Sequence, residues 1–298
     1  MNLEWESSTD KKFSLLCNLP DSLQSALGQA RQQHYEELYE PEAESAVSLQ
    51  DTLDKILQLF QGSNQTLNHL RYVWMALILT SVVEPTVQYY QPKNSIPEEA
   101  TNWIVSWLLK TLEEMLHSKT QLTQVSKEEE AKGIVDIFRF FSKNQKIASF
   151  QILSEALDVY SSAIKTLDYN QSLKTLLDIL DDCLEGYAIF PGSYGRRELF
   201  DWWLLDVVPA SWYLLPPSSI YSIDKLENGK NIAFRQMDKL QKISYSMWNI
   251  ILRASQKKEN QRSDYSPLHS KPISISLNVE FENNRLGSKR YTNELILS

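Results

Sequence analysis

The sequence predicts a mainly α-helical protein, either an irregular multi-helix bundle or a degenerate HEAT-like α-solenoid, with about eight to ten helices. Glycine occurs only 8 times in 298 residues, well below the roughly 7% that is average, which disfavours a many-turned β-sandwich or barrel. Apolar residues recur at helical spacing in segment after segment. Alternation of apolar and polar residues is clear only near the C-terminus, where we expect a short strand or hairpin.

The helical periodicity predicts helices that begin near residues 46, 66, 97, 127, 147, 171, 196 and 231. A further short helix is expected over residues 21–39, with Asp21 as its N-cap. The helix that begins near residue 66 is expected to end at Pro85, because proline lacks the N–H that continues the hydrogen-bond ladder. The uneven spacing of these starts leaves both the bundle and the solenoid open.

Residues 199–208 are apolar on every side of a predicted helix, apart from Asp201 and Asp206. A helix without a polar face is normally buried on all sides, so we expect this segment to be the central element of the fold. Its Trp202 and Trp203, with Trp212 behind them, have two other interpretations, a partner surface or a membrane-interface patch. We favour the core, because continuous apolar runs of helical length are usually buried.

The chain divides into four predicted parts. These are an acidic N-terminal segment with a short helix (1–44), a helical domain (45–254), a polar linker (255–272) and a strand-forming C-terminal tail (273–298). In the tail, apolar residues alternate with polar ones, as in a half-buried strand: Ile273, Ile275, Leu277, Val279 and Phe281. An isolated hairpin is only marginally stable, so we expect this tail to dock on the helical body or to add its edge to a partner's sheet.

Charge and composition narrow the class of protein. The net charge of −8 would repel nucleic acid. The first 50 residues carry a net charge of −6, whereas residues 251–298 carry +3. The N-terminus has acidic residues where a signal peptide is basic, and the most apolar window, residues 72–83, is too short to span a bilayer. Cys17 and Cys183 show no metal or redox spacing. We expect a cytoplasmic protein and do not expect membrane association.

A glycine-rich turn at residues 192–197 is the first candidate for a ligand site. It contains Gly192, Ser193, Gly195, Arg196 and Arg197, and it precedes a predicted helix. Backbone amides at a helix N-terminus and two guanidinium groups suit a phosphate or a carboxylate. The alternative is a tight turn between helices, with the arginines in solvent or paired with Asp201.

Two weaker patterns involve metal-ligand residue types. Glu114 and His117 have the helical E-x-x-H spacing of di-iron carboxylate proteins, but the sequence contains no second E-x-x-H. Asp178, Asp181 and Asp182 form one aspartate cluster where magnesium chemistry of the isoprenoid kind needs two. With only four histidines, the sequence offers no catalytic residue, and we expect no metal and no cofactor.

These observations favour a non-catalytic cytoplasmic adaptor or regulatory protein that binds another protein, with the C-terminal strand as the candidate contact. The alternative is a helical enzyme or small-ligand binder that uses the 192–197 turn as an anion site. A third hypothesis is a peripheral membrane-associated protein.

Overall fold

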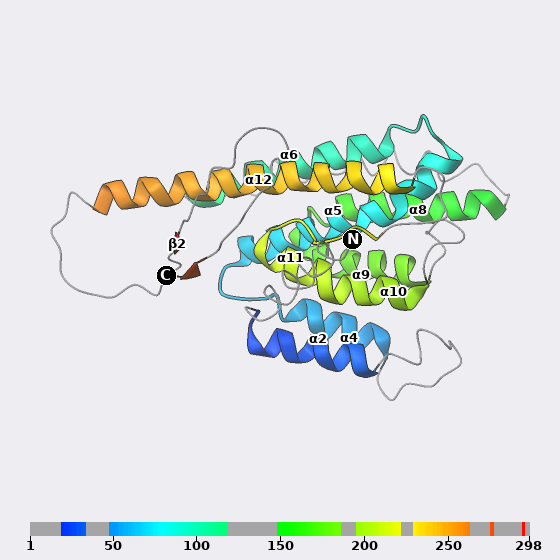
Figure 1. Cartoon of the computed structure of the whole chain (residues 1–298), viewed down its shortest axis with the longest axis horizontal. Helices are drawn as coiled ribbons and strands as arrows, with labels where there is room; N and C mark the ends of the chain where they lie inside the picture. Colours follow the sequence, from blue (N-terminus) through cyan, green and yellow to red (C-terminus); the bar gives the residue numbers. More distant parts are fainter. Residues whose placement is uncertain are drawn as a thin grey trace, which may run out of the picture. The chain divides into compact units, whose positions relative to one another are not determined.

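The long apolar stretch that begins at residue 65 forms α5 (Gln65–Tyr90), and most of its side chains are buried in the computed structural model (Figure 1). The structure describes residues 19–33, 48–117, 148–185, 195–221, 229–262, 275–276 and 294–295. The chain separates into two compact units, Met1–Ala254 and Ser255–Ser298. The predicted mainly helical character is confirmed.

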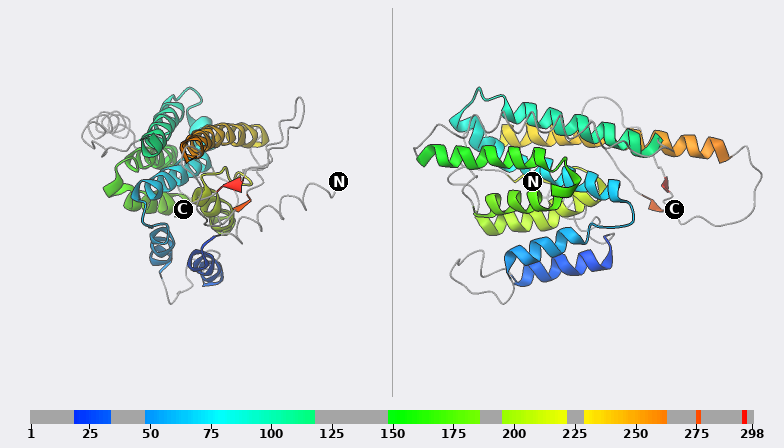
Figure 2. Two further views of the ribbon diagram at one scale, coloured as in Figure 1. Left: turned by 90° about the vertical axis from the view of Figure 1, so that its left-hand side faces the viewer. Right: turned by 180° about the vertical axis from the view of Figure 1, so that it is seen from behind.

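Helix α5 packs against four other helices of the first unit. These are α6 (Ile96–His117), α8 (Ala148–Lys165), α9 (Tyr169–Glu185) and α11 (Val208–Tyr213). Figure 2 shows α5 enclosed by its neighbours when the first unit is seen along its helices. The centre of the core is therefore α5, with the predicted central segment at residues 199–208 packed beside it.

Two N-terminal helices, α2 (Asp21–Gln33) and α4 (Leu49–Gln58), pack against each other, and α4 also contacts α9. They lie on the side of the first unit away from α6 and α12 (Gly229–Arg262) (Figures 1 and 2). Their buried positions follow the predicted apolar stripes: Leu23, Ala26, Leu27 and Ala30 in α2, and Leu53, Ile56 and Leu57 in α4.

Most predicted helix starts lie within three residues of the observed ones, and the start near residue 127 lies outside the described residues. The predicted end at Pro85 is wrong, because α5 continues through Pro85 to Tyr90. Asn64 caps the start of α5, and its side chain accepts a hydrogen bond from the backbone N–H of Leu67 at 3.0 Å.

Residues 196–213 form three successive helical segments, α10 (Arg196–Trp202), the π-helical turn η2 (Trp203–Val207) and α11. The N–H of Val208 donates to the carbonyl of Trp203, five residues earlier. Pro209 follows and has no N–H, so the local ladder cannot keep the regular α pattern. Trp202 and Trp203 are buried, which confirms the prediction that they belong to the core.

Helix α11 ends at Tyr213, and its C-cap residue Leu214 has the left-handed backbone conformation with φ of 55°. Three side chains from other helices bind the carbonyls at this end. Arg71 donates to Trp212, Trp74 to Leu215 and Ser244 to Leu214, all at 2.8–2.9 Å. These contacts join α5 and α12 to the C-terminal end of α11.

Helix α12 extends to Arg262, beyond the predicted helix end near residue 254 and into the segment predicted as a linker. The added turns are rich in lysine, glutamine, glutamate and arginine, which are good helix formers although they are polar. In the second unit, β1 (Ile275–Ser276) pairs antiparallel with β2 (Glu294–Leu295), with Ile275 opposite Leu295.

Candidate functional site

Pro85 leaves the backbone carbonyl of Ser81 without its usual helical donor, because a proline nitrogen carries no hydrogen. The side-chain amide of Gln236, from α12, donates to this carbonyl at 2.9 Å. The same nitrogen also donates to the Glu84 carboxylate at 2.9 Å. A buried carbonyl without a donor costs roughly 1–3 kcal/mol. Gln236 therefore completes α5 and attaches α12 to it.

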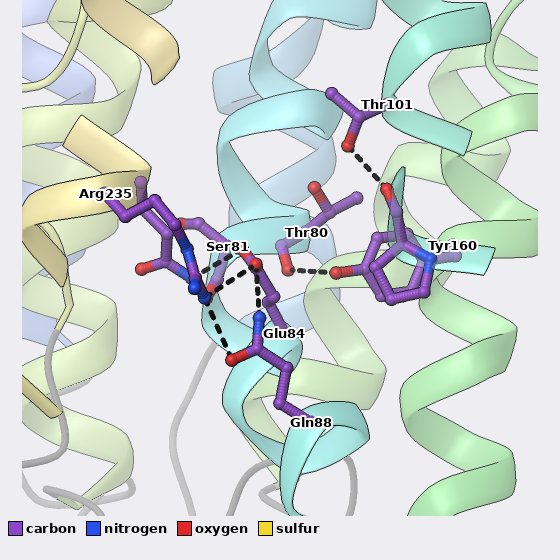
Figure 3. Close-up of polar contacts among 9 residues, drawn as sticks. Thr80, Ser81, Glu84, Gln88, Thr101, Tyr160 and Arg235 are labelled. Carbon is purple, nitrogen blue, oxygen red and sulfur yellow. Dashed lines mark hydrogen bonds and ion pairs between the residues drawn. The ribbon is translucent and has the colours of Figure 1, made fainter. Parts of the chain in front are cut away.

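Glu84 is the charged centre of this contact, and Figure 3 shows it between Gln88 and Arg235. Gln88 donates to its carboxylate at 2.6 Å, and Arg235 lies 3.6 Å from it. Arg235 also donates to the side-chain oxygen of Gln88 at 3.0 Å, so α12 is bound to two successive turns of α5. Burial lowers the pKa of Lys239, one turn further along α12, while Glu84 and Glu98 oppose that shift.

The opposite side of the same α5 turn contacts α8. The hydroxyl of the fully buried Tyr160 donates to the carbonyl of Thr80 at 3.3 Å (Figure 3). Burial, reinforced by the Glu84 carboxylate, raises the pKa of Tyr160 well above its ordinary value. The tyrosine is therefore neutral and acts as a hydrogen-bond donor. Two helices, α8 and α12, are thus fixed to adjacent carbonyls beside Pro85.

Because Gln236 and Arg235 fix its rotation, α12 presents one defined face outward. Phe234 and Tyr245 on this face are 77% and 55% exposed. The residues nine positions further along, Ile243 and Ala254, are 8% and 5% exposed. Nine residues at about 100° each amount to two and a half turns, which reverses the direction of the side chain, so the two aromatic side chains lie opposite the core. We call this the outer face of α12.

The arginines of the predicted anion site bind groups of the protein itself and do not point to a ligand. Gly195 is the N-cap of α10, whereas Gly192 and Ser193 lie outside the described residues. The Nε of Arg196 donates to the carbonyl of Leu184 near the end of α9. This guanidinium group is therefore engaged by the protein's own backbone.

Arg197 is also engaged internally, and it is only 3% exposed. Its Nη2 donates to the carbonyl of Arg31 at 2.8 Å and lies 3.0 Å from the Asp201 carboxylate. Arg31 pairs with the same carboxylate at 3.3 Å. The pairing with Asp201 follows the alternative interpretation of the turn. The acceptor on Arg31, 166 residues away, left no signal in the local sequence.

The aspartate cluster lies on α9 beside acidic residues of α8. Burial, with the carboxylates of Glu155 and Asp158 adding to it, raises the pKa of Asp182 to about 7. Asp178 and Asp181 are exposed. Within the part of the chain that the structure describes, no three His, Cys, Asp or Glu side chains are grouped to hold a metal ion. The side chain of His117 lies outside that part, so the E-x-x-H pattern stays untested.

Helix α5 is longer than the apolar window read from the sequence, because it runs through Glu84 and Pro85. By length and composition it could cross a membrane, but 89% of its most apolar window is buried inside the protein. Core helices of soluble proteins meet the same criterion, so this is weak evidence for a membrane span.

Beyond α5, a solvent-open cleft of about 720 Å³ is lined by Gln91, Pro92, Lys93, Asn94, Ser95, Ile96 and Glu99.

Of the residues predicted to bind a partner through the tail, only Ile275 is described, in β1. Ile273, Leu277, Val279 and Phe281 lie outside the described residues, so the longer strand stays a prediction.

The residues that sequence reasoning missed are Gln236, Arg235, Phe234 and Tyr245. A proline inside an otherwise helical pattern and two aromatic residues eleven positions apart were the available signals.

No family model matches the chain, and no curated protein or solved structure matches it either.

Proposed function

We propose that this chain is a non-catalytic adaptor or regulatory protein whose helical body binds another protein through the outer face of α12. The observation that carries the proposal is the pair of exposed aromatic residues on that face, Phe234 at 77% and Tyr245 at 55% exposure. Aromatic side chains are enriched among the residues that dominate binding energy at protein interfaces.

The polar contacts beside Pro85 support this proposal because they prepare the surface before binding. Gln236 and Arg235 bind α12 to α5 through Ser81, Glu84 and Gln88. A helix held in this way loses little rotational freedom when a partner binds, and pre-organisation of this kind favours affinity. The site chemistry suits the holding of helices rather than proton transfer, because each of these groups already has a partner within the bundle.

We also propose that the body is an irregular bundle rather than a HEAT-like solenoid. In a solenoid each repeat contacts only its neighbours in the sequence. Helix α5 instead packs against α6, α8, α9 and α11, and α4 packs against α9. A cytoplasmic location remains a proposal that rests on the composition.

The two other hypotheses gain no support from the geometry. An anion site at the 192–197 turn needs available guanidinium groups, but those of Arg196 and Arg197 bind internal acceptors. Membrane association through Trp202 and Trp203 needs an exposed patch, but both side chains are buried.

The tail remains a second proposed contact for a partner. Among the described residues, its short β1–β2 pair is a two-stranded sheet, to whose edge a partner strand could add. A deletion of residues 263–298 starts after the last residue of α12 and so tests the tail without shortening that helix. We expect this deletion to leave the helical body folded and to weaken partner capture.

Affinity capture from the native cell tests the proposal. The wild-type chain is compared with the double variant Phe234→Ser/Tyr245→Ser and with Trp103→Ser, which removes a 41% exposed aromatic side chain from α6. We expect the double variant to lose the partner and the Trp103 variant to retain it. Equal recovery by all three chains would contradict the proposal.

A further inference from the structure

The outer face of α12 carries a second apolar stripe with an 11-residue period. Its positions are spaced i, i+3 and i+7, and the set repeats eleven residues later: Phe234, Met237, Gln241, Tyr245, Trp248 and Leu252. Five of the six are apolar or aromatic. Met237, Trp248 and Leu252 are half-buried, whereas Phe234 and Tyr245 are mostly exposed.

An 11-residue period corresponds to about 3.67 residues per turn, close to the 3.6 of a straight α-helix. The core-facing side of α12 follows the same period, since Ile232, Ile243 and Ala254 are all buried. The outer stripe therefore stays on one line for about 27 Å, the length of the 18 steps from Phe234 to Leu252. A straight helix of similar length is the element that can follow this line.

The charge of α12 indicates the chemistry of that helix. Between residues 232 and 254, α12 has one acidic residue, Asp238, and four basic ones: Arg235, Lys239, Lys242 and Arg253. The whole chain has a net charge of −8, so this basic helix contrasts with the rest of the molecule. Arg235, Lys242 and Arg253 are exposed along one side of the stripe. Arg235 pairs with Glu84 and Lys242 with Asp238, but both side chains are more than half exposed, and exposed pairs of this kind are weak enough for a partner's carboxylates to compete.

We infer that the outer face of α12 binds an amphipathic helix of a partner protein that has an apolar stripe bordered by acidic residues. This inference rests on the proposed function and specifies its partner. Acidic borders complement the lysine and arginine side chains, which favours encounter and fixes orientation. A single helix packed on this face buries a small area, so the complex is weak and transient. A membrane surface fits less well, because membrane-bound amphipathic helices present a broader apolar face than this narrow stripe.

Designed peptides test the inference on the full-length chain. The acidic probe has leucine at the six stripe spacings and glutamate on both borders, and the basic probe has lysine in place of each glutamate. Binding of the labelled peptides is followed by fluorescence anisotropy. The acidic probe should bind at least about tenfold more tightly than the basic one, and added salt should reduce that ratio.

The variants locate the binding. Phe234→Ser/Tyr245→Ser should weaken binding of the acidic probe by at least about tenfold, whereas Trp103→Ser should stay within about twofold of wild type. Circular dichroism melting of each variant shows that the fold is kept. Equal binding of the two probes, or no effect of the double variant, would overturn the inference.

Two other occupants are also separated by these experiments. Self-association in sedimentation that disappears in the double variant, without probe binding, would assign the face to a second copy of the chain and overturn the inference. Binding to acidic phospholipid vesicles without probe binding would overturn it in favour of a lipid surface. If the probes fail but capture from the native cell still depends on Phe234 and Tyr245, the partner class is wrong and the proposed function stands.

Discussion

Replacement of Gln236 by methionine tests whether this side chain fills the donor gap created by Pro85. Methionine keeps a similar volume but removes both hydrogen bonds of the amide, to Ser81 and to Glu84. The unsatisfied, buried carbonyl of Ser81 should cost roughly 1–3 kcal/mol. Glu84 is partly solvated, so the loss of its hydrogen bond with Gln236 adds less to the cost than the loss at Ser81. We expect the free energy of unfolding to fall by about 2–3 kcal/mol.

A double-mutant cycle isolates the role of Pro85. Alanine at position 85 restores a backbone N–H that can donate to Ser81, so Gln236→Met should cost only about 1 kcal/mol in a Pro85→Ala background. The resulting coupling energy is about 1–2 kcal/mol. Urea unfolding followed by circular dichroism measures all four chains.

The control is Gln241→Met, an exposed position on the same helix, where the change should stay within about 0.5 kcal/mol. An equal cost of Gln236→Met in the proline and alanine backgrounds would refute the reasoning. It would mean that the stability comes from general packing of α12 and not from the Ser81 carbonyl.

The remaining predictions concern the pH dependence of stability, the half-buried Arg197–Asp201 ion pair and the tail. The raised pKa of Asp182, about 7 against an ordinary 3.8, means that the folded protein holds the extra proton in this window, so stability falls as pH rises through it. Asp182→Asn should flatten that fall and raise the free energy of unfolding by about 1–2 kcal/mol at alkaline pH. This is less than the full pKa shift implies, because solvent screens the partly exposed carboxylate. Unchanged urea curves would contradict this. Arg197→Met removes the buried guanidinium group that binds the Arg31 carbonyl and the half-buried Asp201 carboxylate. It should cost about 2 kcal/mol, against under about 1 kcal/mol for the exposed Lys242→Met. Calorimetry should find the melting temperature of the 263–298 deletion within about 2 °C of wild type, and loss of the transition would show that the tail belongs to the core.

The helical fold could be predicted because most helices bury one stripe and expose the other side. The spacing of Leu53, Ile56 and Leu57 in α4, for example, is a local signal that needs no knowledge of what covers it. Helix α5 lacks such a stripe because it is buried nearly all round. Its central place in the fold therefore depends on contacts that periodicity cannot show.

The prediction that the helix ends at Pro85 fails for the same reason. The local rule that proline ends a helix is correct for an isolated segment. Here the missing donor is replaced by Gln236, which is 155 residues from Ser81 in the chain. Such a replacement can be recognised only when the two helices are seen together.

Residue types alone predict some features of the candidate site and not others. Arginines after a glycine-rich turn suit anions, which is why the sequence predicts a site at Arg196 and Arg197, but their backbone acceptors lie on Leu184 and Arg31. The outer stripe of α12 is visible in the sequence as an 11-residue repeat. Its significance depends on exposure, because only the structure shows which of the two stripes faces the core.

Site-specific photo-crosslinking tests the central claim most directly. A photoreactive amino acid at Gln241, in the middle of the outer stripe, is compared in the native cell with the same group at the exposed Asn102 of α6. We predict a discrete protein adduct at position 241 and none at position 102. Equal adducts at both positions, or none at position 241, would contradict the assignment of α12 as the partner-binding surface.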